Sequence, residues 1–196
     1  MVKKNVAVLV SGGGTNLQAL IDAEKNGIIK SGTISLVVSN KENAYALTRA
    51  GDAGIEAKYI KRGKDFEKNL IELLEEKKID IIVLAGFLSI LSESFVRKYD
   101  KKIINVHPSL IPSFCGDGFY GLKVHEAALQ KGVKVTGATT HFVNEITDGG
   151  EIIMQKAVEI ADNDTAESLQ LKVMKEAEWI ILPLSVEKVC SSQNEI

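Results

Sequence analysis

Five apolar segments separated by helix-like segments constrain the fold of this chain more than any other feature. The apolar segments lie at residues 6–10, 34–38, 56–60, 79–84 and 102–105. The segments expected to be helices lie between them, at residues 16–25, 44–51, 66–77 and 92–99. Apolar strands that alternate with helices are typical of a parallel sheet that is covered on both faces. The first half therefore predicts an α/β fold with a Rossmann-like, open and mostly parallel sheet.

The second half of the chain predicts a change in this pattern. Its expected elements are a helix at 124–130 closed by Gly132, strands at 135–143 and 151–160, and a long helix that begins near Asp164 or Thr165. A turn at 147–150 joins the two strands, which predicts an antiparallel pair in the C-terminal part of the sheet. The last six residues are expected to fray.

Length and charge limit the classes of protein. The 196 residues suit one α/β domain spanning 1–196. With 24 basic and 26 acidic side chains, the chain lacks the basic character of a nucleic-acid binder. No apolar run reaches the ~20 residues of a membrane span, and Cys115 and Cys190 fit neither a disulfide framework nor a metal spacing. We expect a cytoplasmic protein, either a monomer or a homodimer.

A glycine-rich segment, Ser-Gly-Gly-Gly-Thr-Asn at residues 11–16, joins the first strand to the first helix. Main-chain N–H groups at such a helix start favour an anion, and phosphate is the natural ligand. The segment is not a Walker loop. It is also a poor dinucleotide motif, because Leu17 occupies the position of the third glycine. The alternative is a tight turn that binds nothing.

The segment from Asn105 to Pro112, Asn-Val-His-Pro-Ser-Leu-Ile-Pro, predicts a catalytic site. Asn105 and His107 are two residues apart, so on an extended strand they face the same side. Asp148 follows about forty residues later in an Asp-Gly turn. An amide donor, a titratable base and a carboxylate are the groups needed to act on a carbonyl. The alternatives are a buried core histidine and an ordinary turn aspartate.

Two other features bear on ligands. Residues 85–91 follow the fourth strand at the carboxyl end of the sheet, where α/β proteins bind ligands. This apolar segment suits a flat heteroaromatic ring, although an ordinary buried loop has the same composition. His125, expected at a helix start, and His141, expected within a strand, are weaker catalytic candidates. No pair of histidines has metal-ligand spacing, so we expect no metal site.

Taken together, these segments resemble the phosphoribosylglycinamide formyltransferases, folate-dependent enzymes of purine synthesis. The resemblance runs from about residue 5 to about 187. The matching stretches are 11–18, 84–87, 105–112, 135–143 and 147–150. The segment 105–112 with the later aspartate is specific to enzymes that use formyl-folates, and the glycine segment narrows the match to this family.

The resemblance implies a role for each candidate residue. It implies a catalytic trio of Asn105, His107 and Asp148. It implies ribonucleotide contacts from Gly13, Gly14, Thr15, Asn16, Lys175 and Glu178. It implies a folate site made by Leu88, Ser89, Ile90, Leu91 and Asn144, together with Asn105 and Asp148. Lys175 and Glu178 are three apart, so we expect them to share one helix face.

This chain departs from the family pattern in two places. Ser89 stands where we expect arginine, which leaves only a main-chain contact with the folate. The loop 114–122 is longer than the compact form, and it has no assigned role. Near Arg62 the match is ambiguous, so no contact with the folate glutamate is assigned there.

The reaction implied by the resemblance is transfer of a formyl group from 10-formyltetrahydrofolate to the amine of glycinamide ribonucleotide. Asn105 and protonated His107 would stabilise the oxyanion, Asp148 would keep His107 charged, and no metal is required. A formyltetrahydrofolate hydrolase and a methionyl-tRNA formyltransferase share the trio. The former usually has an added regulatory domain and the latter a basic C-terminal domain, neither of which this sequence predicts. A non-catalytic nucleotide-binding module is the alternative from a different class.

Overall fold

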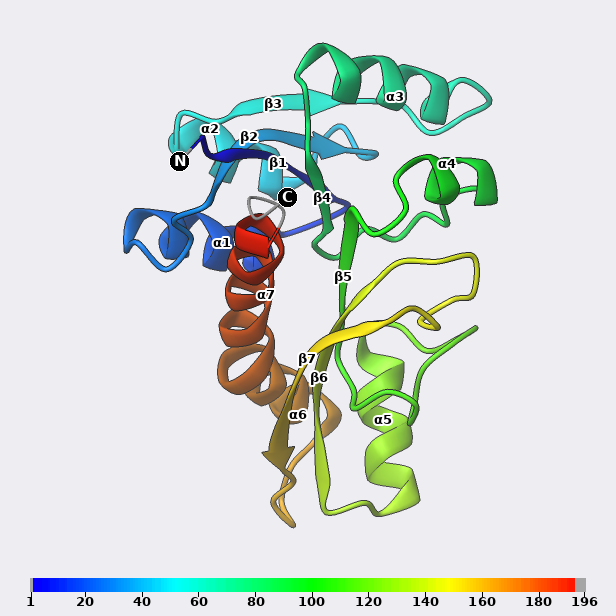
Figure 1. Ribbon diagram of the computed structural model, residues 1–196. Coiled ribbons are helices and arrows are strands. Elements are labelled where there is room, and N and C mark those ends of the chain that lie inside the picture. Colours follow the sequence, from blue (N-terminus) through cyan, green and yellow to red (C-terminus); the bar gives the residue numbers. More distant parts are fainter. Residues whose placement is uncertain (1, 193–196) are drawn as a thin grey trace.

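The apolar segments form neighbouring strands of one sheet in the computed structural model, which describes residues 2–192 (Figure 1). Within these residues the sheet has the order β3-β2-β1-β4-β5-β6-β7. The strands are β1 (Lys4–Val10), β2 (Gly32–Ser39), β3 (Glu56–Tyr59), β4 (Ile81–Leu84), β5 (Ile103–His107), β6 (Val135–Phe142) and β7 (Ile152–Glu159). Strands β1 to β5 pair in parallel, and β6 and β7 are antiparallel. The Rossmann-like prediction and the antiparallel C-terminal part are confirmed.

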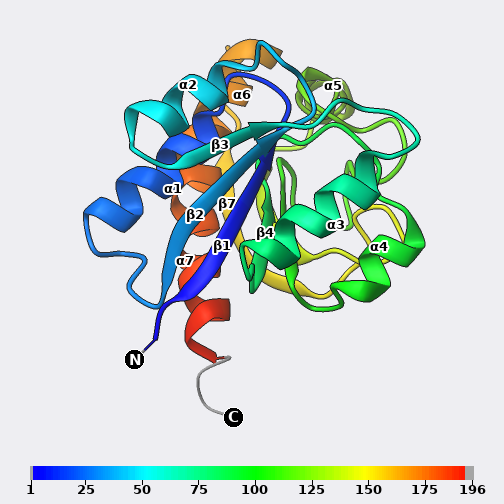
Figure 2. The same cartoon turned by 90° about the horizontal axis from the view of Figure 1, so that it is seen from above.

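Helices cover both faces of this sheet. They are α1 (Thr15–Lys25), α2 (Tyr45–Asp52), α3 (Phe66–Glu76), α4 (Glu93–Lys98), α5 (Leu122–Lys131), α6 (Ala166–Val173) and α7 (Trp179–Ser192). Helices α1, α2 and α7 pack on one face, and α3 and α4 pack on the other (Figure 2). Among residues 2–192, no helix is long and apolar enough to cross a membrane.

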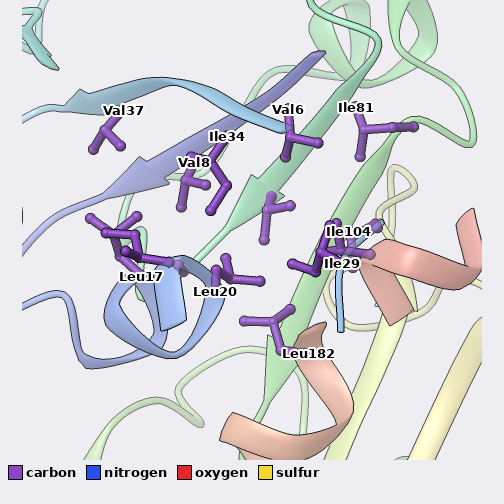
Figure 3. Packing of buried hydrophobic residues seen from close by; sticks show 14 of the residues in the cluster. Val6, Val8, Leu17, Leu20, Ile29, Ile34, Val37, Ile81, Ile104 and Leu182 are labelled. Atoms are coloured by element: carbon purple, nitrogen blue, oxygen red, sulfur yellow. The ribbon is translucent and has the colours of Figure 1, made fainter. Parts of the chain in front are cut away.

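The parallel strands are apolar on both sides because each separates two cores. In β1, Val6 and Val8 belong to the core under α1 and α7, whereas Ala7 and Leu9 belong to the core under α3 and α4. Figure 3 shows Val8 on the same side of the sheet as Leu20 of α1 and Leu182 of α7. Each fully buried side chain of this size contributes about 1.5–3 kcal/mol to folding. This burial fixes the framework on which the loops are held.

The structure corrects two predictions about element boundaries. Strand β5 continues past Asn105 and ends at His107, because both residues pair with β6. The long C-terminal helix is not uniform, since a π-helix (Met174–Glu178) separates α6 from α7. Ser191 and Ser192, expected to fray, are the last residues of α7, and residues 193–196 lie outside the described part. Thr165 caps α6 as expected.

Candidate active site

Strand β5 presents the amide and the imidazole on one side of the sheet. Ile103 lies in the core under α3 and α4, while Ile104 lies in the opposite core. Asn105 and His107 therefore point to the α3–α4 side, as their spacing predicts. His107 is only 5% exposed. The strand places a polar pair at its C-terminal end, where the apolar core stops.

The turn after His107 is fastened to the antiparallel strands. The Thr139 hydroxyl donates to the Ser109 carbonyl at 2.7 Å and accepts from the Ile111 N–H at 3.1 Å. Gln155 Nε2 also donates to the Ile111 carbonyl at 3.0 Å. The Ile111–Pro112 peptide bond is cis. Because the Thr139 hydroxyl on β6 bonds both Ser109 and Ile111 of the turn, the turn has a fixed position relative to β6.

Asp148 reaches His107 from a loop that crosses the same face of the sheet. Val143 packs on the core under α3 and α4, and Arg97 of α4 donates to Glu145 at 2.9 Å. At the far end of the loop, Asp148 Oδ2 lies 3.4 Å from His107 Nδ1. The structure thus brings His107 and Asp148 together, although 41 positions separate them in the sequence.

The environment of Asp148 favours its charged form. Burial raises the pKa of this carboxyl group, but hydrogen bonds from His141 and the Gly116 N–H outweigh burial, with help from the charges of His107 and His141. The resulting pKa lies below its usual value. The Gly116 N–H donates to Oδ2 at 2.9 Å. A buried anion at neutral pH is therefore available to the neighbouring imidazoles.

His141 belongs to this cluster, although the sequence ranked it as a weaker candidate. It pairs with Asn105 across β5 and β6, and its Nε2 lies 3.2 Å from Asn105 Nδ2 and 3.6 Å from Asp148 Oδ1. Its Nδ1 lies 2.8 Å from the Phe142 carbonyl, which can only accept, so Nδ1 carries a hydrogen. When the ring is neutral, Nε2 accepts one of the two amide hydrogens of Asn105 and the second stays available to a ligand, whereas a charged ring turns the same nitrogen into a donor towards Asp148.

His125 is also buried, but its side chain makes no hydrogen bond with any of residues 2–192. It lies in the first turns of α5 and is 0% exposed, and neither ring nitrogen has a hydrogen-bond partner in the described part of the chain. Burial, followed by the charge of His107, lowers its pKa to about 4. At neutral pH this ring is uncharged, so it packs as a core side chain and does not supply charge to the site.

The glycine segment forms the start of α1. Gly14 caps the helix with a φ of 73°, and the N–H groups of the first turn, including those of Thr15 and Asn16, have no acceptor within the helix. A Cβ atom on Gly14 would lie 2.6 Å from Ala46 Cβ, whereas one on Gly12 or Gly13 would meet nothing within 4 Å. Packing therefore requires Gly14, and the two glycines before it leave the main chain open.

Helix α2 holds this segment from behind. Ala46 N–H donates to the Gly12 carbonyl at 3.1 Å, and Arg49 Nε donates to the Gly13 carbonyl at 2.8 Å. A cavity of about 630 Å³, lined by residues 11–13 and 41–45, lies beside the segment. None of the trio lines this cavity. Hydrogen bonds from α2 thus hold the main chain of the glycine segment in a fixed position beside the cavity.

Glu178 meets the glycine segment from the C-terminal part of the chain. Asn16 Nδ2 donates to Glu178 Oε2 at 2.7 Å, across 162 positions. Glu178 is buried, and burial raises its pKa, while the hydrogen bond from Asn16 opposes that shift. Lys175 is exposed, so the expectation that it shares a face with Glu178 is wrong. The reason is the π-helix, whose wider turn separates residues three apart.

The expected folate segments are neighbours on the α3–α4 side. Leu91 and Val143 pack against the same core, while Leu88 and Ile90 are 61% and 87% exposed. Ser89 accepts a hydrogen bond from Asn40 Nδ2 at 2.7 Å. Side chains that are apolar and exposed beside a polar cluster are suited to binding a flat ring.

Asn144 lies in the same loop as Asp148 and stabilises its conformation. Its Oδ1 accepts from the Ile146 N–H at 3.0 Å, and its Nδ2 donates to the Gly149 carbonyl at 3.3 Å. Among residues 2–192, no group of three or more His, Cys, Asp or Glu side chains is arranged to hold a metal ion.

Comparison with known proteins identifies the family of this chain. Residues 4–186 match the family model described as formyl transferase. Phosphoribosylglycinamide formyltransferase from Haemophilus influenzae is 40% identical over 94% of this chain and 86% of its own length. The crystal structure of phosphoribosylglycinamide formyltransferase from Anaplasma phagocytophilum has a TM-score of 0.88 at 41% identity, and it covers 97% of this chain and 88% of that one.

The match extends to longer proteins. The human trifunctional purine biosynthetic protein adenosine-3 is 45% identical over 96% of this chain, which spans only 18% of that protein. Several curated relatives are longer than this chain in this way. The chain belongs to the formyl transferase family. Within that family, the relatives described above that match it over most of their own length are phosphoribosylglycinamide formyltransferases.

Proposed function

We propose that this chain transfers the formyl group of 10-formyltetrahydrofolate to the amine of glycinamide ribonucleotide, and that it does so as one formyltransferase domain. The observation that carries the proposal is the cluster of Asn105, His107 and Asp148 on one face of the sheet, with His107 Nδ1 3.4 Å from the carboxylate. A negatively charged carboxylate beside an imidazole favours the imidazolium form. The family relationship supports formyl transfer as the chemistry.

The proposed mechanism is direct attack of the neutral amine on the formyl carbon. The carbonyl electrons move to oxygen as the new C–N bond forms, and collapse of the intermediate breaks the bond to the folate nitrogen, which takes up the amine proton. Asn105 donates its second amide hydrogen to the oxyanion, and His107 donates from Nδ1 because Nε2 is bonded to the Phe114 carbonyl at 2.8 Å. One such donor is typically worth ~10²–10³ in rate.

The substrates have separate places in this proposal. The N–H groups at the start of α1 bind the ribonucleotide phosphate, with contributions from Gly13, Gly14, Thr15 and Asn16. Glu178 and Lys175 contact the rest of the ribonucleotide. Leu88, Ser89, Ile90 and Leu91 hold the folate ring against Asn144, Asn105 and Asp148. The exposed apolar side chains at 88 and 90 support this assignment.

A spectrophotometric assay tests the function. The purified chain is mixed with glycinamide ribonucleotide and 10-formyltetrahydrofolate, and the absorbance of the deformylated folate is followed. We expect deformylation that requires the ribonucleotide and is ~10²–10³-fold slower in His107→Ala. Deformylation without the ribonucleotide would favour the hydrolase, and binding of the ribonucleotide without turnover would favour the non-catalytic module.

Competition by inorganic phosphate tests the glycine segment. We expect phosphate to compete with the ribonucleotide and not with the folate, because the anion binds at the start of α1. Inhibition that is competitive with the folate alone would place the anion elsewhere.

A further inference from the structure

The loop that follows the cis proline, which the sequence left without a role, makes three polar contacts with the catalytic region. The Phe114 carbonyl accepts from His107 Nε2 at 2.8 Å. The Gly116 N–H donates to Asp148 Oδ2 at 2.9 Å. Asp117 Oδ1 accepts from the Thr147 hydroxyl at 3.2 Å, which ties this loop to the loop of Asp148. We call residues 114–117 the clasp.

The clasp determines where His107 carries its permanent hydrogen. A carbonyl oxygen only accepts, so the ring nitrogen bonded to Phe114, Nε2, must be protonated. The hydrogen bond made by one ring nitrogen decides the proton state of the other. Nδ1 is then the nitrogen that gains or loses a proton, and it faces Asp148 Oδ2 at 3.4 Å. Both the neutral and the charged ring can keep the bond to Phe114.

The direction of this carbonyl depends on an uncommon main-chain conformation. Phe114 has a φ of 51°, in the left-handed region that residues other than glycine rarely adopt. Its ring packs edge-on against Phe119, with centroids 6.5 Å apart, which helps to hold residue 114 in place. Gly116 has a φ of 87°, which glycine adopts readily. The left-handed turn therefore aims one carbonyl at His107 and one N–H at Asp148.

We infer that Phe114 and Gly116 are positioning residues, which hold the His107–Asp148 pair so that proton exchange occurs at Nδ1 of His107. The Phe114 carbonyl acts on His107 and the Gly116 N–H acts on Asp148, and neither main-chain group contacts the reacting atoms. This inference rests on the proposed formyl transfer, in which Nδ1 is the donor to the oxyanion.

Substitutions at Phe114 separate the main-chain effect from the loss of the ring. Phe114→Val retains an apolar side chain, but its β-branch disfavours a positive φ, so the carbonyl turns away from His107. Phe114→Gly loses the ring but adopts a positive φ readily. Phe119→Leu is the matched control, because it removes the ring contact and leaves residue 114 unchanged.

Nitrogen-15 NMR of the His107 ring across a pH titration reads the tautomer without any assay of turnover. We expect the neutral ring of the wild type, of Phe114→Gly and of Phe119→Leu to carry its hydrogen on Nε2. In Phe114→Val we expect a mixture of tautomers. A wild-type ring with its hydrogen on Nδ1 would overturn the inference, even if Phe114→Val does not fold.

Kinetics provide the second readout. For Phe114→Val we expect kcat to fall at least tenfold and its pH profile to shift, while KM for both substrates stays within about threefold. A Phe114→Val enzyme with the wild-type tautomer and the wild-type pH profile would also overturn the inference. If the wild type does not transfer formyl groups at all, the proposed function fails, and the NMR result still decides whether the clasp sets the tautomer.

Discussion

The two halves of this protein differ in what they bury. In residues 2–100 the buried side chains are almost entirely apolar, and the three buried polar ones lie at element ends: Ser11 follows β1, Ser39 ends β2, and Asn16 lies in the first turn of α1. Nine of the twelve buried polar or charged side chains among the described residues lie after residue 100, including all three histidines. In the proposed function, the first half supplies main-chain N–H groups and exposed apolar side chains to the ligands, and the second half supplies the ionisable side chains.

This difference follows from the topology. Parallel strands covered on both faces have no room for polar side chains except at their ends. The antiparallel strands β6 and β7 lie at one end of the sheet, and their loops fold back over it, so they bring His141 and Asp148 beside His107. We therefore expect substitutions in the first half to change binding and stability, and those in the second to change turnover and pH dependence.

The largest expected effect is that of His107→Ala. Removing the imidazole removes a donor to the oxyanion, so kcat should fall by ~10²–10³ with the fold intact. Circular dichroism checks the fold, and the spectrophotometric assay measures the rate. If the variant keeps more than about a tenth of the turnover, the substitution raises the activation barrier by less than ~1.4 kcal/mol, and the oxyanion role is wrong.

The next effect is on acid stability, through His125. Its pKa is about 4 in the folded protein and ~6.5 in the unfolded chain, so the unfolded chain binds the extra proton between these values. The free energy of unfolding should therefore fall as the pH drops from about 6.5 towards 4, by about 3 kcal/mol in all.

Urea unfolding at pH 7.5, 6 and 5 measures this dependence. His125→Leu should lose less stability than the wild type over the same range, because no proton is taken up at this position. Glu126→Gln, an exposed change on the same helix, is the control and should follow the wild type. Equal slopes for the wild type and His125→Leu would show that His125 is not the acid-sensitive group.

Gly14→Ala tests the first half and has the smallest expected effect. The new Cβ would lie 2.6 Å from Ala46 Cβ at a φ of 73°, which should cost about 2 kcal/mol of stability. We expect KM for the ribonucleotide to rise about tenfold and kcat to change little. Gly12→Ala, whose Cβ meets nothing within 4 Å, should retain wild-type stability. A kcat loss in Gly14→Ala as large as that in His107→Ala would remove the distinction between the two halves.

Much of the fold could be predicted from the sequence, because local patterns determine it. Apolar runs such as 6–10 predict buried strands, and the two-residue spacing of Asn105 and His107 predicts their common face. The pairing of Asn105 with His141 depends on the register between β5 and β6, which no local pattern specifies. The π-helix before Trp179 could not be predicted from the sequence either, because its single wider turn alters the hydrophobic periodicity of the helix over only five residues.

The candidate site could be predicted only in part, because some of its contacts depend on tertiary structure and not on a local pattern. The Asp-Gly turn at 148 indicates a hairpin, and only the family resemblance connected Asp148 to His107. The contacts of Phe114 and Gly116 come from main-chain atoms, so the identity of the two residues does not indicate these contacts. The cytoplasmic location and the choice between monomer and homodimer stay predictions.

The pH–rate profile of Asp148→Asn, measured beside the wild type, tests the central claim most directly. The substitution is nearly isosteric and removes the negative charge 3.4 Å from His107 Nδ1. Without that charge, an imidazole is mostly neutral at pH 7.5 and donates less well to an oxyanion. We predict a sharp loss of turnover at pH 7.5, partial recovery at lower pH, and ribonucleotide affinity within about threefold of the wild type. An unchanged turnover and profile would contradict the account and leave Asp148 an ordinary turn residue.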